Sequence, residues 1–260
     1  MTADLPVRDP AVVGRLRAAG CVFAEEEAAL LAEAASSSSA ELADLVARRV
    51  AGEPLEQVLG WAEFCGLRFV VEPGVFVPRQ RTRLLVREAA ALAAPGDVVL
   101  DLCCGVGAVG TAVAVAVGSV ELHAADVDPV AVRCARRNVP GAVHCGDLYD
   151  ALPDELRGRV DVLVVNAPYV PTEAIALMPP EARDHEARAA LDGGPDGLDV
   201  QRRVAAGAPD WLAPGGALLI ETSRQQADRT LALCTAAGLA ARVVTDDDLA
   251  ATVVVAVREA

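Results

Sequence analysis

The sequence contains no lysine: all 23 basic residues are arginine. A lysine Schiff base and a phosphate-binding loop built around a lysine are therefore excluded. Aromatic residues are also scarce, at 3% of the chain, although hydrophobic residues make up 53%. Alanine and valine dominate the hydrophobic set. This composition favours a core of small, closely packed side chains, as where helices lie flat on a sheet.

Signals for metal binding, disulfides, secretion and membrane insertion are missing as well. The seven cysteines form no Cys-x-x-Cys pair and the three histidines are scattered, so neither a zinc site nor a disulfide framework is predicted. His123 lies in a strand-like segment and is interpreted as a structural histidine. The N-terminus lacks the apolar run of a signal peptide, and the longest apolar run, 108–117, is too short to span a bilayer. We expect a cytoplasmic protein with no membrane partner.

The net charge of −14 argues against broad affinity for nucleic-acid phosphates. Direct binding of nucleic acid is therefore not expected. A basic or neutral protein partner is more compatible with this negative charge.

The pattern of residues divides the chain into three parts. Residues 1–60 are predicted to form short helices at 11–19, 25–35 and 38–49, with one more turn near 55–59, and Ser38-x-x-Glu41 is a capping box for the third helix. Residues 61–81 are interpreted as a β-hairpin linker whose turn is Pro73-Gly74, between strands at 66–72 and 75–77.

Residues 82–260 alternate between helix and strand. The strands are near-continuous apolar runs, which predicts an α/β fold with a parallel sheet covered on both faces. The expected strands are 98–102, 120–125, 142–145, 160–165, 217–221, 242–244 and 252–257, and the expected helices are 83–93, 108–117, 129–138, 199–212 and 225–237.

Ligands of such sheets bind beyond the carboxyl ends of the strands. The first strand ends in Asp101-Leu-Cys-Cys-Gly-Val-Gly-Ala-Val-Gly110, where Gly105 and Gly107 permit a tight turn and close approach of a ligand. Asp126 ends the next strand roughly 20 residues later, where an acid can bind ribose hydroxyls. Each motif alone also fits an ordinary turn or helix cap.

Two further strand ends carry polar groups. Asp147 follows the third strand and could accept an adenine amino proton, while Leu148 could cover the ring. Asn166-Ala-Pro-Tyr169 follows the fourth strand and combines a polar amide, a rigid proline and an aromatic ring. Four such motifs in this order indicate an adenosine site beside a polar reaction site.

Together these motifs resemble the class I S-adenosylmethionine-dependent methyltransferases, specifically the HemK/PrmC group of protein-(glutamine-N5) methyltransferases. The resemblance covers nearly the whole chain, including 52–60, Glu63-Phe64, Val77-Pro-Arg79, Glu186 and 190–198. It implies a Rossmann-like, mostly parallel seven-stranded sheet in 82–260, a helical substrate-recognition domain in 1–60 and a hairpin linker in 61–81. It also implies a monomer that methylates a glutamine side chain of a protein, typically a peptide-chain release factor.

The resemblance also implies roles for residues. The catalytic residues would be Asn166, Ala167, Pro168 and Tyr169. The cofactor would be S-adenosyl-L-methionine, with S-adenosyl-L-homocysteine as product. The residues implied to bind it are Asp101, Cys103, Cys104, Gly105, Val106, Gly107, Asp126, Val127, Asp147, Leu148 and Asn166. No metal is implied.

The chain departs from the family pattern at several of these positions. Ala167 replaces the first proline of Asn-Pro-Pro-Tyr, Cys103-Cys104 replaces Gly-Thr or Gly-Ser, and Ala187 replaces a proline. Gln80-Arg-Thr-Arg83 replaces Pro-Glu-Thr-Glu, and these arginines could contact an acidic substrate or could simply be a solvated helix start. This resembles a divergent paralogue group with Asn-x-Pro-Tyr.

The motif suggests a mechanism and leaves alternatives. The Asn166 side-chain oxygen and the carbonyl of residue 167 would each accept one hydrogen bond from a substrate NH₂, and Tyr169 would pack on the substrate amide. Three other functions remain possible from the sequence: a small-molecule N-methyltransferase, an adenine-N6 methyltransferase of nucleic acid, and a non-enzymatic cofactor-binding protein. An NAD oxidoreductase would share the glycine turn and Asp126 but would not explain Asn166–Tyr169.

Overall fold

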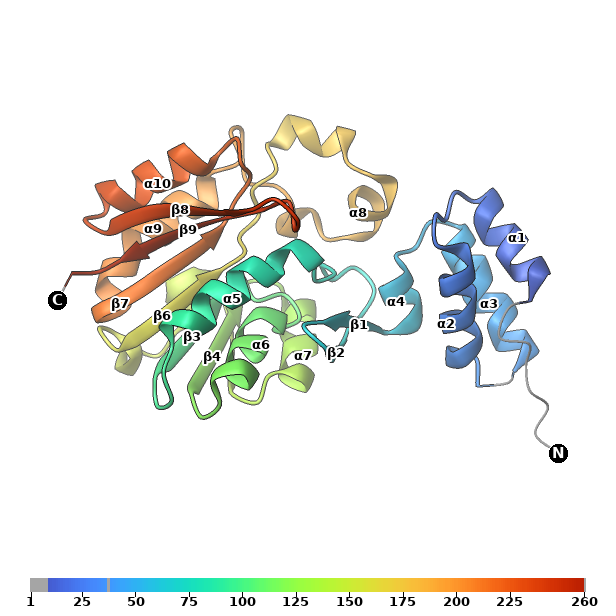
Figure 1. The fold of residues 1–260 in the computed structure, drawn as a ribbon, viewed down its shortest axis with the longest axis horizontal. Coiled ribbons are helices and arrows are strands. Elements are labelled where there is room, and N and C mark those ends of the chain that lie inside the picture. The colour runs from blue at the N-terminus through green and yellow to red at the C-terminus, as the bar shows by residue number, and fades with distance from the viewer. Residues whose placement is uncertain (1–8, 37, 260) are drawn as a thin grey trace.

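The computed structural model describes residues 9–36 and 38–259, and Figure 1 shows two lobes joined by a small hairpin. One lobe is a bundle of helices near the N-terminus, and the other is a sheet with helices on both faces. None of the helices in the described residues combines the length and the apolar character that a bilayer crossing needs.

The helical bundle is built from short, capped helices around one apolar core. Ser38 caps the third helix, because its Oγ accepts a hydrogen bond from the Glu41 backbone N–H at 3.2 Å, as the capping box predicts. Leu16, Leu31 and Val46 are fully buried between the helices. The helices are α1 (Pro10–Ala18), α2 (Ala24–Ala34), α3 (Ser39–Val50) and α4 (Leu55–Leu59).

A buried arginine fastens this bundle to the second lobe. Arg49, at the end of α3, is 8% exposed and binds Glu27 of α2 through its Nε, 2.7 Å from Glu27 Oε2. Its Nη1 donates to Glu181 of helix α8 (Pro180–His185) in the other lobe. Arg49 thus ties two helices of the bundle to a segment that, as described below, borders a cavity.

The hairpin between the lobes exists, but the predicted position of its turn is wrong. Strands β1 (Trp61–Phe64) and β2 (Leu67–Val70) pair antiparallel across the two-residue turn Cys65-Gly66. Both turn residues have positive φ, 51° and 75°, which matches the right-handed twist of a tight hairpin. Residues 75–77 do not pair with β2; instead Gly74 forms a single bridge with Glu186, far along the chain.

A seven-stranded sheet forms the second lobe, and its strand order is β5-β4-β3-β6-β7-β9-β8. All neighbouring strands pair parallel except β9, which runs antiparallel to β7 and β8. The strands are β3 (Val98–Leu102), β4 (Glu121–Asp126), β5 (Ala142–Cys145), β6 (Val160–Val165), β7 (Leu212–Glu221), β8 (Ala240–Asp246) and β9 (Ala251–Val257).

Helices cover both faces of this sheet, which explains the continuous apolar strands. Val99 and Val164 belong to the core cluster under α5, α6 and α7, whereas Leu100 and Val165 belong to the cluster under α9 and α10. Because alternate residues of a strand face opposite sides, a strand buried on both faces must be apolar throughout. The helices are α5 (Arg83–Leu92), α6 (Ala108–Val117), α7 (Pro129–Asn138), α9 (Asp199–Trp211) and α10 (Ala227–Ala236).

Most predicted elements are present, and the differences are local. The bounds of α6, α7, β5 and β6 match the prediction. β7 begins at Leu212, five residues before the predicted start, because the chain continues the strand through Pro214-Gly215 with a shift of register against β6. Helix α8 and the 3₁₀ turns within 172–190 were not predicted.

We expect Arg49→Met to destabilise the helical bundle strongly, because it leaves the Glu27 carboxylate buried without its partner. Breaking a buried ion pair from one side costs about 3–5 kcal/mol. Arg48→Met is the matched control: Arg48 pairs with Glu53 but is partly exposed, and such pairs contribute about 0–1 kcal/mol. Urea denaturation followed by circular dichroism measures both. Equal losses in the two variants would contradict the buried role of Arg49.

Candidate active site

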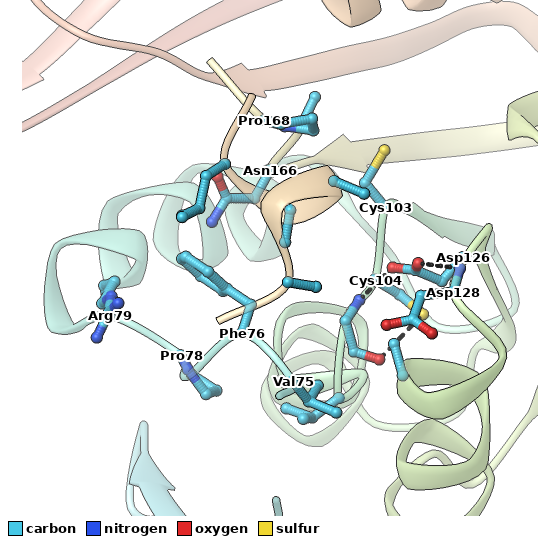
Figure 2. Close-up of a pocket in the computed structure, with 18 of the residues that line it drawn as sticks. Val75, Phe76, Pro78, Arg79, Cys103, Cys104, Asp126, Asp128, Asn166 and Pro168 are labelled. Carbon is cyan, nitrogen blue, oxygen red and sulfur yellow. Dashed lines mark hydrogen bonds between the residues drawn. The ribbon is translucent and has the colours of Figure 1, made fainter. Parts of the chain in front are cut away.

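A cavity of about 470 Å³ opens at the carboxyl ends of β3, β4, β5 and β6. Figure 2 shows Asn166 and Phe76 on one side of it and Cys104, Asp126 and Asp128 on the other. Thirteen of the fourteen residues singled out from the sequence line this cavity; the exception is Gly107. The four strand-end motifs therefore converge on one space.

The glycine loop between β3 and α6 is held to the neighbouring strand by hydrogen bonds. The Gly105 N–H donates to Asp126 Oδ2 at 2.8 Å, and the Cys104 N–H donates to the Ala125 carbonyl at 3.1 Å. A Cβ on Gly105 would meet open space, whereas a Cβ on Gly107, with φ of 80°, would lie 2.2 Å from Val139 Cγ2. Gly105 thus gives the cavity its open floor, and Gly107 lets α6 pack against α7.

Two carboxyl groups beneath the loop are buried. Asp101 is 2% exposed and accepts a hydrogen bond from the Gly110 N–H at 2.8 Å. Burial raises the pKa of Asp101 to about 7, with the neighbouring Asp126 charge adding to the rise. Burial also raises the pKa of Asp126, although hydrogen bonds from the Asp128 and Gly105 backbone N–H groups oppose that rise. The floor of the cavity therefore holds two carboxyl groups that burial drives toward the protonated form.

The two cysteines of the loop are walls of the cavity. Cys103 adopts φ of 58°, a left-handed conformation that completes the tight turn. Burial raises the pKa of both thiols, and the nearby carboxylates raise it further. Because thiols with raised pKa values stay protonated and weakly nucleophilic, the two side chains fit a role as small apolar residues in the cavity wall.

The third strand end supplies an acid that already has a partner. Asp147 Oδ2 accepts a hydrogen bond from Arg203 Nη2 of α9 at 2.8 Å, so the carboxylate is oriented by an arginine that also lines the cavity. Leu148 is buried and has φ of 49°. Val106 is buried in the loop, and Val127 lies on the exposed rim, with 58% of its surface accessible.

The fourth strand end carries the Asn166–Tyr169 motif. The Asn166 Nδ2 donates to Thr82 Oγ1 at 3.4 Å, which leaves the amide oxygen as the acceptor of that side chain. Ala167 is 1% exposed, so its methyl group fills the place behind the motif. The Tyr169 hydroxyl accepts a hydrogen bond from Arg81 at 2.8 Å and donates to Glu221 at 3.4 Å. Burial, followed by the Glu221 charge, raises the pKa of Tyr169 to about 12.

The remaining wall of the cavity comes from segments that are distant in sequence. Phe76, Met178 and Leu191 line it with apolar surface. The buried Glu186 fastens two of these segments, because its Oε1 accepts hydrogen bonds from the Val77 N–H at 3.1 Å and from Arg79 at 2.6 Å. Arg79 and Arg81 therefore form internal ion pairs, with Glu186 and Glu221, while both side chains still line the cavity.

Comparison with known proteins agrees with this geometry. The sequence profile of the Methyltransferase small domain family matches residues 66–247. The release factor glutamine methyltransferase of Geobacter sulfurreducens is 41% identical over 199 residues, which cover 75% of this chain and 69% of that protein.

The chain belongs to the HemK/PrmC family of methyltransferases.

Two further relatives define the range of similarity. The 4-amino-L-phenylalanine/4-methylamino-L-phenylalanine methyltransferase of Streptomyces pristinaespiralis is 37% identical over 203 residues, which cover 74% of this chain and 69% of that protein. A methyltransferase structure from Pyrococcus furiosus superposes with a TM-score of 0.58 at 16% identity, covering 84% of this chain and all of that one, and shows the shared fold. The predicted α/β fold with a mostly parallel seven-stranded sheet is thus confirmed in this chain.

The cofactor of this family member is S-adenosylmethionine, and the residues of the cavity fit it. The open floor at Gly105 admits the ligand close to the backbone, and Asp126 stands at the strand end where ribose hydroxyls are bound. Leu148 offers an apolar face that fits a base, and the carboxyl groups of Asp126 and Asp147 in the lining fit a cationic sulfonium. Among the described residues, no group of three or more His, Cys, Asp or Glu side chains is placed to bind a metal ion.

Sequence reasoning missed the side chains behind the motif. Thr82, Arg203 and Phe76 line the cavity, and Glu221 lies behind it at the end of β7. The pattern of the chain gave no local signal for them, apart from the position of Glu221 at the end of a strand. Their contacts join residues far apart in sequence and become visible only in the folded chain.

We expect Asp126→Ala to weaken S-adenosylmethionine binding by roughly 10- to 100-fold, since a hydrogen bond to a charged group contributes about 1.5–3 kcal/mol. Isothermal titration calorimetry at fixed ionic strength measures the dissociation constant. Asp154→Ala is the control, because Asp154 is exposed and lies outside the cavity. An unchanged dissociation constant for Asp126→Ala would remove this residue from the cofactor site.

Proposed function

We propose that this protein transfers the methyl group of S-adenosylmethionine to the side-chain amide nitrogen (N5) of a glutamine in a protein, with peptide-chain release factors as the first candidate substrate. The observation that carries the proposal is the position of Asn166–Tyr169 on the wall of the same cavity as the glycine loop. A planar NH₂ group bound at the motif would therefore face the methyl donor.

An amide nitrogen is a poor nucleophile, because its lone pair is delocalised into the carbonyl. Holding it in line with the methyl group can supply roughly 7–11 kcal/mol of the barrier. The substrate NH₂ group has two protons to donate. We expect the Asn166 Oδ1 and the Ala167 carbonyl oxygen to accept one hydrogen bond each. These hydrogen bonds strengthen as the nitrogen becomes positive in the transition state.

Replacing the family's first proline by Ala167 keeps the carbonyl that this geometry needs. Pro168 still restricts residue 167 to extended backbone conformations. Ala167 is 1% exposed, so packing holds it in place without a ring. When bound, S-adenosylmethionine would supply an activated methyl group on its sulfonium, and Asn166 with the Ala167 carbonyl would hold the acceptor nitrogen toward that group.

The protein substrate is supported by the relatives named release factor glutamine methyltransferase and by the helical bundle beside the cavity. Such a substrate requires neither a membrane nor direct contact with nucleic acid, and it implies an enzyme that works in the cytoplasm. We expect it to act as a monomer.

A second candidate is methylation of a small-molecule amine. The relative from Streptomyces pristinaespiralis, named for an amino-acid substrate, is nearly as similar to this chain as the release factor enzymes are. The apolar wall of Phe76, Met178 and Leu191 would accept an aryl amine in the place of a glutamine side chain.

One assay separates the two candidates. Radiolabelled S-adenosylmethionine is incubated with the protein and either purified class I release factors, 4-amino-L-phenylalanine, or a size-fractionated cell lysate. Label mapped by mass spectrometry to a release-factor glutamine supports the proposal. Label found only on the small molecule would support the second candidate instead. Label on a glutamine of another protein would support the same chemistry with a different protein substrate.

We expect Asn166→Ala to lower kcat by at least roughly 100-fold, by analogy with the loss of a transition-state hydrogen bond elsewhere. The dissociation constant for S-adenosylmethionine should stay within a few-fold, because Asn166 lies at the substrate end. Single-turnover kinetics measures this rate with whichever acceptor the labelling assay identifies. A variant with normal melting temperature and near-normal turnover would show that Asn166 does not orient the nucleophile.

A further inference from the structure

Behind the Asn166–Tyr169 motif lies a buried carboxylate that contacts the tyrosine end of the motif directly. Glu221, the last residue of β7, is 2% exposed. Its Oε1 accepts a hydrogen bond from the Tyr169 hydroxyl at 3.4 Å and one from Arg81 Nε, also at 3.4 Å. The other end of the motif lies toward Thr82, whose hydroxyl is close enough to the Glu221 carboxylate to lower the pKa of that group.

Thr82 connects this carboxylate to Asn166. Its side chain is buried, and its Oγ1 accepts a hydrogen bond from Asn166 Nδ2 at 3.4 Å. A hydroxyl can donate one proton and accept others, so its direction depends on its partners. Glu221 Oε2 is buried and has no hydrogen-bond partner among the described residues, so it is the acceptor toward which we expect the Thr82 hydroxyl proton to turn.

The direction of the hydrogen bonds follows from the charge of the carboxylate. An ionised carboxylate can only accept, so Thr82 donates to Glu221 and turns a lone pair toward Asn166. Asn166 must then present its NH₂ to Thr82, which directs its oxygen to the cavity. If Thr82 donated to Asn166 instead, the amide would turn over and show its NH₂ to the substrate, where two donors would face each other.

We infer that Thr82 and Glu221 are positioning residues for methyl transfer, which fix the Asn166 amide with its oxygen toward the substrate nitrogen. Burial raises the pKa of Glu221, while the Thr82 hydrogen bond and the Arg81 charge lower it. Arg81 also donates to the Tyr169 hydroxyl, so the same ion pair holds the aromatic ring. The inference rests on the proposed function for its catalytic consequence, though not for the orientation of the amide.

The chain offers a direct readout of that orientation, because it contains only two asparagines, Asn138 and Asn166. Protein labelled with ¹⁵N-asparagine therefore gives two side-chain NH₂ pairs in a proton–nitrogen correlation spectrum. Asn138 is an internal control, since its amide bonds to the Val70 and Val106 backbone, away from Thr82. The Asn166→Ala variant identifies the second pair.

Thr82→Val removes the hydroxyl at nearly the same volume, and Thr82→Ser keeps it. Glu221→Gln keeps the shape of the carboxylate but adds a donor. We expect Thr82→Val and Glu221→Gln to shift the Asn166 NH₂ resonances and to leave the Asn138 resonances unchanged. Thr82→Ser should leave the resonances of both asparagines unchanged. With the acceptor that the wild-type protein methylates, kcat should fall by roughly 10- to 100-fold in the first two variants. The dissociation constant for S-adenosylmethionine should not change, and Thr82→Ser should restore turnover.

The inference is overturned if Glu221→Gln leaves the Asn166 resonances unmoved, or if Thr82→Val keeps the wild-type kcat. Should Glu221→Gln fail to fold, shown by loss of the Asn138 pair, the comparison of Thr82→Val with Thr82→Ser decides the question. If the wild-type protein methylates no tested acceptor, the proposed function fails, while the spectra still decide how the Asn166 amide is held.

Discussion

The active site depends on the parallel register of three central strands. Leu102 of β3 stands opposite Ala125 of β4 and Val165 of β6. The next residue after each of these is therefore Cys103, Asp126 or Asn166, so the glycine loop, the Asp126 carboxyl group and the Asn166 amide meet at one edge of the sheet. Because successive side chains point to opposite faces of the sheet, a shift of one residue in the register of any strand would move each of its side chains to the other face. Burial on both faces fixes the register and so fixes the site.

The same edge gathers carboxyl groups where a buried charge is costly. Burial raises the pKa of Asp101, Asp126, Glu186 and Glu221. For Asp101 the pKa of about 7 in the folded protein lies well above the ordinary value of an aspartate. Ionisation of this group therefore lowers the stability of the folded state as the pH rises from about 4 to 7. A cationic cofactor offsets part of that cost when it binds. The cavity is therefore less stable alone than with its ligand, as expected of a site that binds a sulfonium.

Much of the fold could be predicted because its signals are local. The apolar strand 160–165 and helix 129–138, with proline in its first turn, match the structure. The hairpin turn was misplaced because Pro73-Gly74 is the stronger turn signal in sequence, while Cys65-Gly66 makes the turn through two positive φ values. The segment 172–190 has neither helical nor strand periodicity, and tertiary contacts alone give it shape.

The site divides in the same way. The four strand-end motifs were predicted because each follows a recognisable apolar run. The ion pair of Arg81 with Glu221 joins residues 140 positions apart, and the ion pair of Arg49 with Glu181 joins residues 132 apart. No pattern along the chain reports such pairs. The motif itself can therefore be predicted from the sequence, whereas the side chains that contact it can be identified only in the folded structure.

A crystal structure with S-adenosylhomocysteine and a glutamine-containing acceptor peptide tests the central claim most directly. The account predicts the ribose on Asp126, the adenine beside Leu148, and the glutamine NH₂ between Asn166 Oδ1 and the Ala167 carbonyl, facing the sulfur. A nucleoside bound elsewhere, or an acceptor nitrogen directed away from Asn166, would contradict it.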